Sequence, residues 1–131
     1  MNKRIMIVDD EPDILMSLRI FFENNNYDVI TVKNGFDCIN ELKKGFKGIV
    51  LMDIMMPKMD GWATIKKIVE KGLMKNIAIQ IITGKGTEDH DKITGLEPYI
   101  HDYLAKPFNP DELILNVDNL YFKLFSNNST E

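Results

Sequence analysis

The 131-residue chain has the length of one domain with a single hydrophobic core. Its hydrophobic fraction of 44% is that of an ordinary globular domain, and its net charge of -4 argues against the basic surface of most nucleic-acid-binding proteins. No apolar run approaches the ~20 residues that span a bilayer, and the N-terminus lacks the apolar stretch of a signal peptide, so we expect no membrane contact. The lone Cys38 has no second cysteine to pair with, which favours a reducing compartment, the cytoplasm.

Short apolar runs alternate along the chain with segments of helical period, the pattern of βαβ units around a parallel sheet. The first run, Ile5 to Val8, contains no polar residue and is typical of a strand that helices cover on both faces. In chain order, we expect strands at residues 3–8, 28–32, 48–53, 77–83 and 101–105.

Apolar residues at helical spacing predict helices between and after these strands. The stripes lie within residues 14–22, 36–42, 62–69 and 113–125. Turn-forming residues end the first three stripes: Asn24 to Asn26, Gly45 and Gly72. Asn109 and Pro110 suit the N-cap and the first position of the last helix.

One segment departs from this regular alternation. From Thr87 to Leu96 the chain is polar, and Gly95 and Pro98 interrupt any helical pattern. We therefore expect a short or irregular fourth helix that ends near Gly95. We also expect residues 1–125 to form the domain and residues 126–131 to form a polar C-terminal tail.

The first strand runs directly into a cluster of carboxylates: Asp9, Asp10, Glu11 and Asp13. Two carboxylates ~4 Å apart repel by about 4 kcal/mol at an effective dielectric constant near 20, so a nearby cation would stabilise the cluster. Alternatively, these acids cap the following helix, whose N-terminal dipole favours negative charge. This stretch alone leaves both interpretations open.

A candidate site forms where the strands end. Right-handed crossovers bring the carboxyl ends of all strands to one edge of the sheet, where open α/β sheets bind their ligands. Asp9 and Asp10 follow the first strand, and Asp53 ends the third. Thr83 ends the fourth strand, and Lys106 follows the fifth. Three carboxylates, one hydroxyl and one ammonium group are therefore expected to converge.

These residue types suit phosphoryl transfer. Oxygen ligands favour Mg2+, which binds one or two carboxylates, a carbonyl group and several waters. With such an ion beside it, Asp53 can act as a nucleophile and form an aspartyl phosphate. Phosphoryl transfer depends mainly on positioning and charge neutralisation, which Lys106 and the metal would supply while Thr83 donates a hydrogen bond.

Several motifs together resemble the receiver domain of two-component response regulators, in particular that of the chemotaxis regulators. They are Asp9-Asp10, Asp53 followed by Met56-Pro57 and Asp60-Gly61, Thr83, and Lys106-Pro107-Phe108. The resemblance covers residues 3–125. It implies an α/β fold of the flavodoxin-like (βα)5 type, with a doubly wound five-stranded parallel sheet in the order 2-1-3-4-5.

By this resemblance, the protein is a phosphorylation-activated signalling switch. It would not be an enzyme for a separate substrate and would catalyse only its own phosphorylation and slow dephosphorylation. Asp53 would accept the phosphoryl group from a phosphohistidine of a sensor histidine kinase or a phosphotransfer protein. Asp10, Asp53 and the backbone carbonyl of Met55 would hold Mg2+, with Asp9 acting largely through water.

The resemblance also implies how the signal is read. Lys106 and Thr83 would contact the phosphoryl oxygens, and Tyr103 matches the switch aromatic, which turns inward when Thr83 is drawn toward the phosphate. A downstream effector protein or domain would bind the face made by the fourth helix, the fifth strand and the fifth helix, without direct nucleic-acid contact. The Lys106-Pro107 bond is expected to be cis. Met55 and Lys85, beside the site, are expected to tune the phosphate lifetime.

Three other functions are alternatives. A phosphorylation-independent docking module would not need the acidic pair together with Asp53, Thr83 and Lys106. A Mg2+-dependent aspartyl-phosphate phosphatase typically carries a second carboxylate two residues after the nucleophile, where this chain has Met55. Flavin binding on a similar fold requires a loop rich in Ser, Thr and Gly to hold the phosphate, which the sequence lacks.

Overall fold

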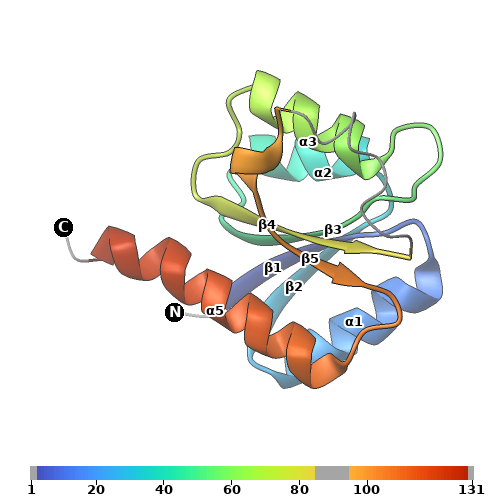
Figure 1. The fold of residues 1–131 in the computed structure, drawn as a ribbon, viewed down its shortest axis with the longest axis vertical. Coiled ribbons are helices and arrows are strands. Elements are labelled where there is room, and N and C mark those ends of the chain that lie inside the picture. Colours follow the sequence, from blue (N-terminus) through green and yellow to red (C-terminus); the bar gives the residue numbers. More distant parts are fainter. Residues whose placement is uncertain (1–2, 85–94, 130–131) are drawn as a thin grey trace.

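The computed structural model describes residues 3–84 and 95–129 (Figure 1). Along these residues, five strands alternate with four α-helices, and one short 3-10 helix precedes the last strand. In chain order the elements are β1 (Lys3–Val8), α1 (Pro12–Asn24), β2 (Tyr27–Val32), α2 (Gly35–Lys43), β3 (Gly48–Asp53), α3 (Gly61–Glu70), β4 (Ile77–Thr83), η1 (Glu97–Tyr99), β5 (Ile100–Ala105) and α5 (Pro110–Ser129).

The strands form one parallel sheet in the order β2-β1-β3-β4-β5, which confirms the expected topology. The expected bounds of β1, β3 and β4 agree with the structure, whereas β2 and β5 each begin one residue earlier than expected. Val8 pairs with Met52, and Asp53 pairs with Ile82. This register places the carboxyl ends of the three central strands at the same edge, so the residues that follow them lie side by side.

Helices cover both faces of this sheet. In Figure 1, α1 and α5 lie on one face and α2 and α3 lie on the other. Ile5 and Ile7 of β1 pack toward α1 and α5, while Met6 and Val8 pack toward α2 and α3. All four side chains are fully buried, which explains why the sequence of this strand is apolar without alternation.

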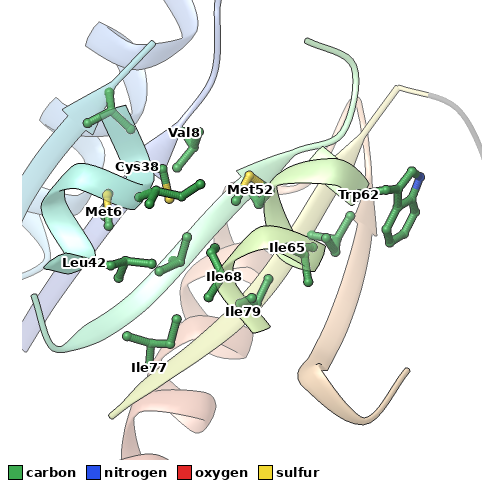
Figure 2. Close-up of a cluster of buried hydrophobic side chains, with 14 of the residues drawn as sticks. Met6, Val8, Cys38, Leu42, Met52, Trp62, Ile65, Ile68, Ile77 and Ile79 are labelled. Atoms are coloured by element: carbon green, nitrogen blue, oxygen red, sulfur yellow. The ribbon is translucent and has the colours of Figure 1, made fainter. Parts of the chain in front are cut away.

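Figure 2 shows the apolar cluster on the face that α2 and α3 cover. Side chains from β1, β3 and β4 meet side chains from the two helices there: Met6, Val8, Met52, Ile77 and Ile79 from the strands, and Cys38, Leu42, Trp62, Ile65 and Ile68 from the helices. Burial raises the pKa of the Cys38 thiol to about 12. Cys38 is therefore an apolar filler and not a nucleophile at neutral pH.

Side-chain caps fix the starts of two helices near the carboxyl edge of the sheet. Asp60 accepts a hydrogen bond from the backbone N–H of Ala63 at 2.8 Å, at the start of α3. Asn109 accepts one from the backbone N–H of Asp111 at 2.8 Å, which confirms Asn109 as the cap of α5. The loops that precede α3 and α5 are thereby held against the sheet edge.

Two expectations concern the less regular parts of the chain. Most of the expected fourth helix lies outside the described residues, and where the description resumes, Glu97–Tyr99 forms a 3-10 helix that leads into β5. The helical backbone of α5 continues to Ser129, into the segment expected as a polar tail. The division of the chain at residue 125 stays a prediction.

Replacing Gly61 with alanine is expected to lower the free energy of unfolding by about 1–3 kcal/mol, because there is no room for a Cβ atom at this position. A Cβ at this position would lie 2.7 Å from the backbone oxygen of Asp53 and 2.9 Å from the Cα of Ile54. Urea denaturation measures the loss.

Gly84→Ala is the matched control for this substitution. Among the described atoms, nothing lies within 4 Å of a Cβ built on Gly84. We therefore expect its free energy of unfolding to change by less than about 0.5 kcal/mol. Equal losses in the two variants would contradict the close approach of α3 to the end of β3.

Candidate functional site

The carboxyl edge of the sheet brings together the residues expected to form the site. Asp9 follows β1, Asp53 ends β3, Thr83 ends β4 and Lys106 follows β5. Asp9, Asp10 and Asp53 each offer a carboxylate oxygen, and these oxygens lie within 4.8 Å of one another. Two separate segments of the chain thus supply one acidic cluster, which we define as Asp9, Asp10 and Asp53.

Backbone N–H groups orient two carboxylates of the acidic cluster. Oδ1 of Asp9 accepts a hydrogen bond from the N–H of Glu11 at 3.0 Å, and Oδ1 of Asp53 accepts one from the N–H of Met55 at 3.2 Å. Both acids are buried, with 0% and 2% of their surface exposed, whereas Asp10 is reached by solvent. Each buried carboxylate is therefore fixed through one oxygen and keeps a second one for another partner.

The interpretation of these acids as helix caps fits only part of the stretch. Glu11 occupies the N-cap position of α1, but its side chain makes no capping hydrogen bond. Asp13 lies in the first turn of α1, where the helix dipole favours a negative charge. Asp9 and Asp10 gather with Asp53 instead, which favours the interpretation as a cation site.

Lys106 places an ammonium group against the acidic cluster. Its Nζ lies 3.2 Å from Oδ2 of Asp9 and 3.7 Å from Oδ1 of Asp53. Its backbone N–H donates to the carbonyl oxygen of Thr83 at 2.7 Å, and its peptide bond to Pro107 is cis, as expected. The direct ion pair with Asp9 could not be predicted from the sequence, because strand-end spacing does not show which carboxylate a long side chain will reach.

Burial makes Asp53 a weaker acid than an exposed aspartate. It raises the pKa of Asp53 from 3.8 to about 6; the charges of Asp9 and Asp10 add to this, while Lys106 and the N–H of Met55 oppose it. Burial alone would lower the pKa of Lys106, but Asp53 and Asp9 together outweigh it and raise that pKa. The ammonium group thus neutralises the three carboxylates only in part.

The donor set of the acidic cluster fits a hard divalent cation. Such ions prefer oxygen ligands, and Mg2+ in particular binds few protein groups and keeps several waters. The exposure of Asp10 to solvent is compatible with this arrangement. Met55, whose carbonyl the sequence assigned to the metal, follows Asp53 by two residues and is already tied to it by its N–H. The acidic cluster can therefore hold a metal ion.

Thr83 and Tyr103 lie on neighbouring strands beside the acidic cluster. Thr83 is buried at the end of β4, and Tyr103 is partly buried on β5, where it pairs with Ile81. The ring of Tyr103 packs beside that of Trp62 in α3, with 6.3 Å between the ring centroids. The sequence did not indicate Trp62, since its apolar character fits an ordinary core position.

A parallel sheet in this order, with an acidic cluster and a lysine at its carboxyl edge, defines a doubly wound α/β protein whose carboxyl edge can hold a cation. The family model of the response regulator receiver domain matches residues 5–118. The chain therefore belongs to the response regulator receiver domain family, whose members are phosphorylation-activated switches of two-component signalling and generally not classical enzymes. Sensor kinases and downstream effectors are the general partners of such regulators.

Similar curated proteins are longer than this chain. It is 37% identical over 113 residues to the alkaline phosphatase synthesis transcriptional regulatory protein PhoP of Bacillus subtilis, covering 86% of this chain and 46% of that protein. It is 36% identical over 120 residues to the response regulator SaeR of Staphylococcus aureus, covering 92% of this chain and 51% of that protein. The chain spans about half the length of these relatives.

Solved structures show the same fold. A CheY-like response regulator receiver domain protein from Methanospirillum hungatei has a TM-score of 0.89 and 38% identity, covering 95% of this chain and 98% of that one. The receiver domain of the Francisella response regulator 1452 has a TM-score of 0.80 and 28% identity, covering 93% of this chain and 98% of that one.

Within residues 3–84 and 95–129, no helix is long and apolar enough to cross a membrane.

In the absence of metal, Asp53→Asn is expected to stabilise the protein near neutral pH. The pKa of about 6 in the folded protein exceeds the usual value of 3.8, so the stability that the protonated carboxyl contributes is fully present below about pH 4 and is lost as the pH rises through 6. Since one pKa unit corresponds to about 1.4 kcal/mol, we expect the variant to exceed the wild type by about 1–2 kcal/mol near pH 7. Urea denaturation in EDTA at several pH values measures this difference.

Asp13→Asn, at an exposed position of α1, is the control for this substitution. It should show no gain in stability that grows between about pH 4 and pH 7. A pH profile of Asp53→Asn that runs parallel to that of the wild type would contradict the raised pKa of Asp53.

Proposed function

We propose that Asp53 is the phospho-acceptor of this receiver domain. The observation that carries the proposal is the place of its carboxylate, which is buried at the end of β3, grouped with Asp9 and Asp10, and 3.7 Å from Nζ of Lys106. An oxygen of Asp53 attacks the phosphorus of a phosphohistidine. A P–O bond forms as the P–N bond breaks, and the electron pair of the broken bond leaves with the imidazole nitrogen.

Mg2+ is the cofactor that this donor set supports. Asp10, Asp53 and the backbone carbonyl of Met55 would hold it, with Asp9 acting largely through water. When bound, the ion supplies positive charge for the phosphoryl oxygens and offsets the repulsion within the acidic cluster. The single-point attachment of Asp53 to the N–H of Met55 leaves its other oxygen for this chemistry.

Lys106 and Thr83 complete the site. The ammonium group of Lys106, which lies 3.2 Å from Oδ2 of Asp9 and 3.7 Å from Oδ1 of Asp53, would move from its ion pair with Asp9 onto an oxygen of the phosphoryl group on Asp53. The hydroxyl of Thr83 donates a hydrogen bond to another phosphoryl oxygen. Tyr103, two residues before the carboxyl end of β5, then turns inward as Thr83 moves toward the phosphate.

The partners follow from this chemistry. A sensor histidine kinase or a phosphotransfer protein donates the phosphoryl group, and a downstream effector protein or domain reads the change, without direct nucleic-acid contact by this chain. We also propose that the domain works in the cytoplasm and slowly dephosphorylates itself. Met55, which is 51% exposed beside Asp53, would then influence the access of the hydrolytic water. Lys85, the other residue expected to tune the lifetime, lies outside the described residues.

The two nearest alternatives receive less support. An aspartyl-phosphate phosphatase would need an acid two residues after Asp53, where Met55 offers only a thioether. A phosphorylation-independent docking module would gain nothing from burying Asp9 and Asp53 together, since burial of like charges opposes folding.

Incubation with Mg2+ and acetyl phosphate, followed by intact mass measurement, tests the proposal. The wild type is expected to gain the mass of one phosphoryl group, and this gain should disappear in Asp53→Asn and in the presence of EDTA. Lys106→Met should gain it more slowly by roughly 100-fold, because it removes a charge that stabilises the transition state.

Two matched variants control for unspecific effects of charge. Asp13→Asn on α1 and Lys47→Met, which precedes β3 at the opposite edge of the sheet, should behave like the wild type. A gain of mass in Asp53→Asn would place the acceptor elsewhere. No gain in the wild type, with Mg2+ binding demonstrated, would favour the docking module.

A further inference from the structure

Trp62 is buried, and its indole nitrogen has no hydrogen-bond partner within residues 3–84 and 95–129. The residue is 5% exposed, and Nε1 finds no acceptor among the residues that the structure describes. Buried donors are nearly always paired, and leaving one unpaired costs free energy. An apolar filler at this position would need no N–H, so the indole calls for a functional explanation.

The position of Trp62 ties it to the phospho-acceptor. It is the second residue of α3, whose start is fixed by the cap at Asp60 and by the close approach of Gly61 to the backbone oxygen of Asp53. Figure 2 shows the indole at the border of the apolar cluster, with its nitrogen directed away from the other labelled side chains. The indole therefore lies on the first turn of α3, directly after the loop that leads from Asp53, with its nitrogen at the border of the apolar cluster.

Tyr103 is the neighbour of this indole on β5. The two ring centroids are 6.3 Å apart and the ring planes are tilted by 51°, so the side chains touch without stacking. Burial and then the negative charge of Glu97 raise the pKa of Tyr103, which keeps its hydroxyl neutral at neutral pH. A neutral phenol hydroxyl can accept a hydrogen bond from an indole N–H.

We propose that Trp62 is a positioning residue of the switch, whose indole N–H donates a hydrogen bond to the hydroxyl of Tyr103 when that ring turns inward. This inference rests on the proposed function, because phosphorylation of Asp53 provides the cause of the movement. The two rings already lie beside each other, with centroids 6.3 Å apart, so the proposed hydrogen bond requires a reorientation of the phenol ring toward Nε1. The unpaired donor favours the inward position because that position satisfies it.

The protein contains one tryptophan, so its indole N–H gives one identifiable signal in a proton–nitrogen correlation spectrum. The experiment compares labelled wild type and Tyr103→Phe, each with Mg2+ alone and with Mg2+ and acetyl phosphate. The intact mass of each sample establishes its degree of phosphorylation. Tyr99→Phe, which alters a tyrosine of the adjacent 3-10 helix, is the matched control.

We expect the resonance of the indole proton to shift downfield on phosphorylation of the wild type and of Tyr99→Phe. In equally phosphorylated Tyr103→Phe, its chemical shift should not change. A merely structural tryptophan would not distinguish the two tyrosines. Two results, each with a full gain of mass, would overturn the role of Trp62 and leave the proposed function intact. One is an unchanged indole chemical shift in the wild type, and the other is the same change of chemical shift in Tyr103→Phe as in the wild type. No gain of mass would overturn both.

Discussion

The burial of two carboxylates beside each other, at the ends of two adjacent strands, is the constraint on which the site of this receiver domain depends. Asp9 and Asp53 are buried, and Asp10 brings a third carboxylate to within 4.8 Å. Lys106 approaches the two buried acids, yet the pKa of Asp53 remains raised to about 6. Among the residues that the structure describes, the single ammonium group of Lys106 thus faces three carboxylates, which leaves a net negative charge at the site. A site of this kind favours a divalent cation, which would offset the repulsion among the three carboxylates.

The topology of the sheet produces this concentration of charge. Parallel strands in the order β2-β1-β3-β4-β5 put the ends of β1 and β3 next to each other, with β4 and β5 completing the edge. Local backbone contacts then position the segments that carry the site residues. The carbonyl oxygen of Thr83 accepts a hydrogen bond from the N–H of Lys106, and the missing side chain of Gly61 allows α3 to start against the end of β3. The first turn of α3 also places the ring of Trp62 beside that of Tyr103. Asp53 and Tyr103 are thus linked through one short loop and the first turn of α3.

The sequence predicted those features of the fold and of the candidate site that follow from continuous runs of apolar residues. The bounds of β1, β3 and β4 agree because fully buried strands are read from continuous apolar runs, and Asp53 and Lys106 follow from where those runs end. The contact of Trp62 with Tyr103 could not be predicted, because it depends on how α3 packs against β5 and an apolar stripe does not specify a partner. The ion pair of Lys106 with Asp9 could not be predicted for a similar reason, since the backbone geometry determines which acid the lysine side chain contacts. The polar residues from Thr87 to Leu96 carry no regular hydrophobic period, so the sequence predicted only a short or irregular helix there.

Calorimetric titration of the unphosphorylated protein with Mg2+ tests the charge imbalance most directly. The wild type is expected to bind one ion near neutral pH, with affinity falling as the pH drops toward the pKa of Asp53, about 6. Asp10→Asn should bind far more weakly, whereas Asp13→Asn should bind like the wild type. Equal binding by all three proteins, or no binding by the wild type, would contradict the assignment of Asp9, Asp10 and Asp53 as a cation site.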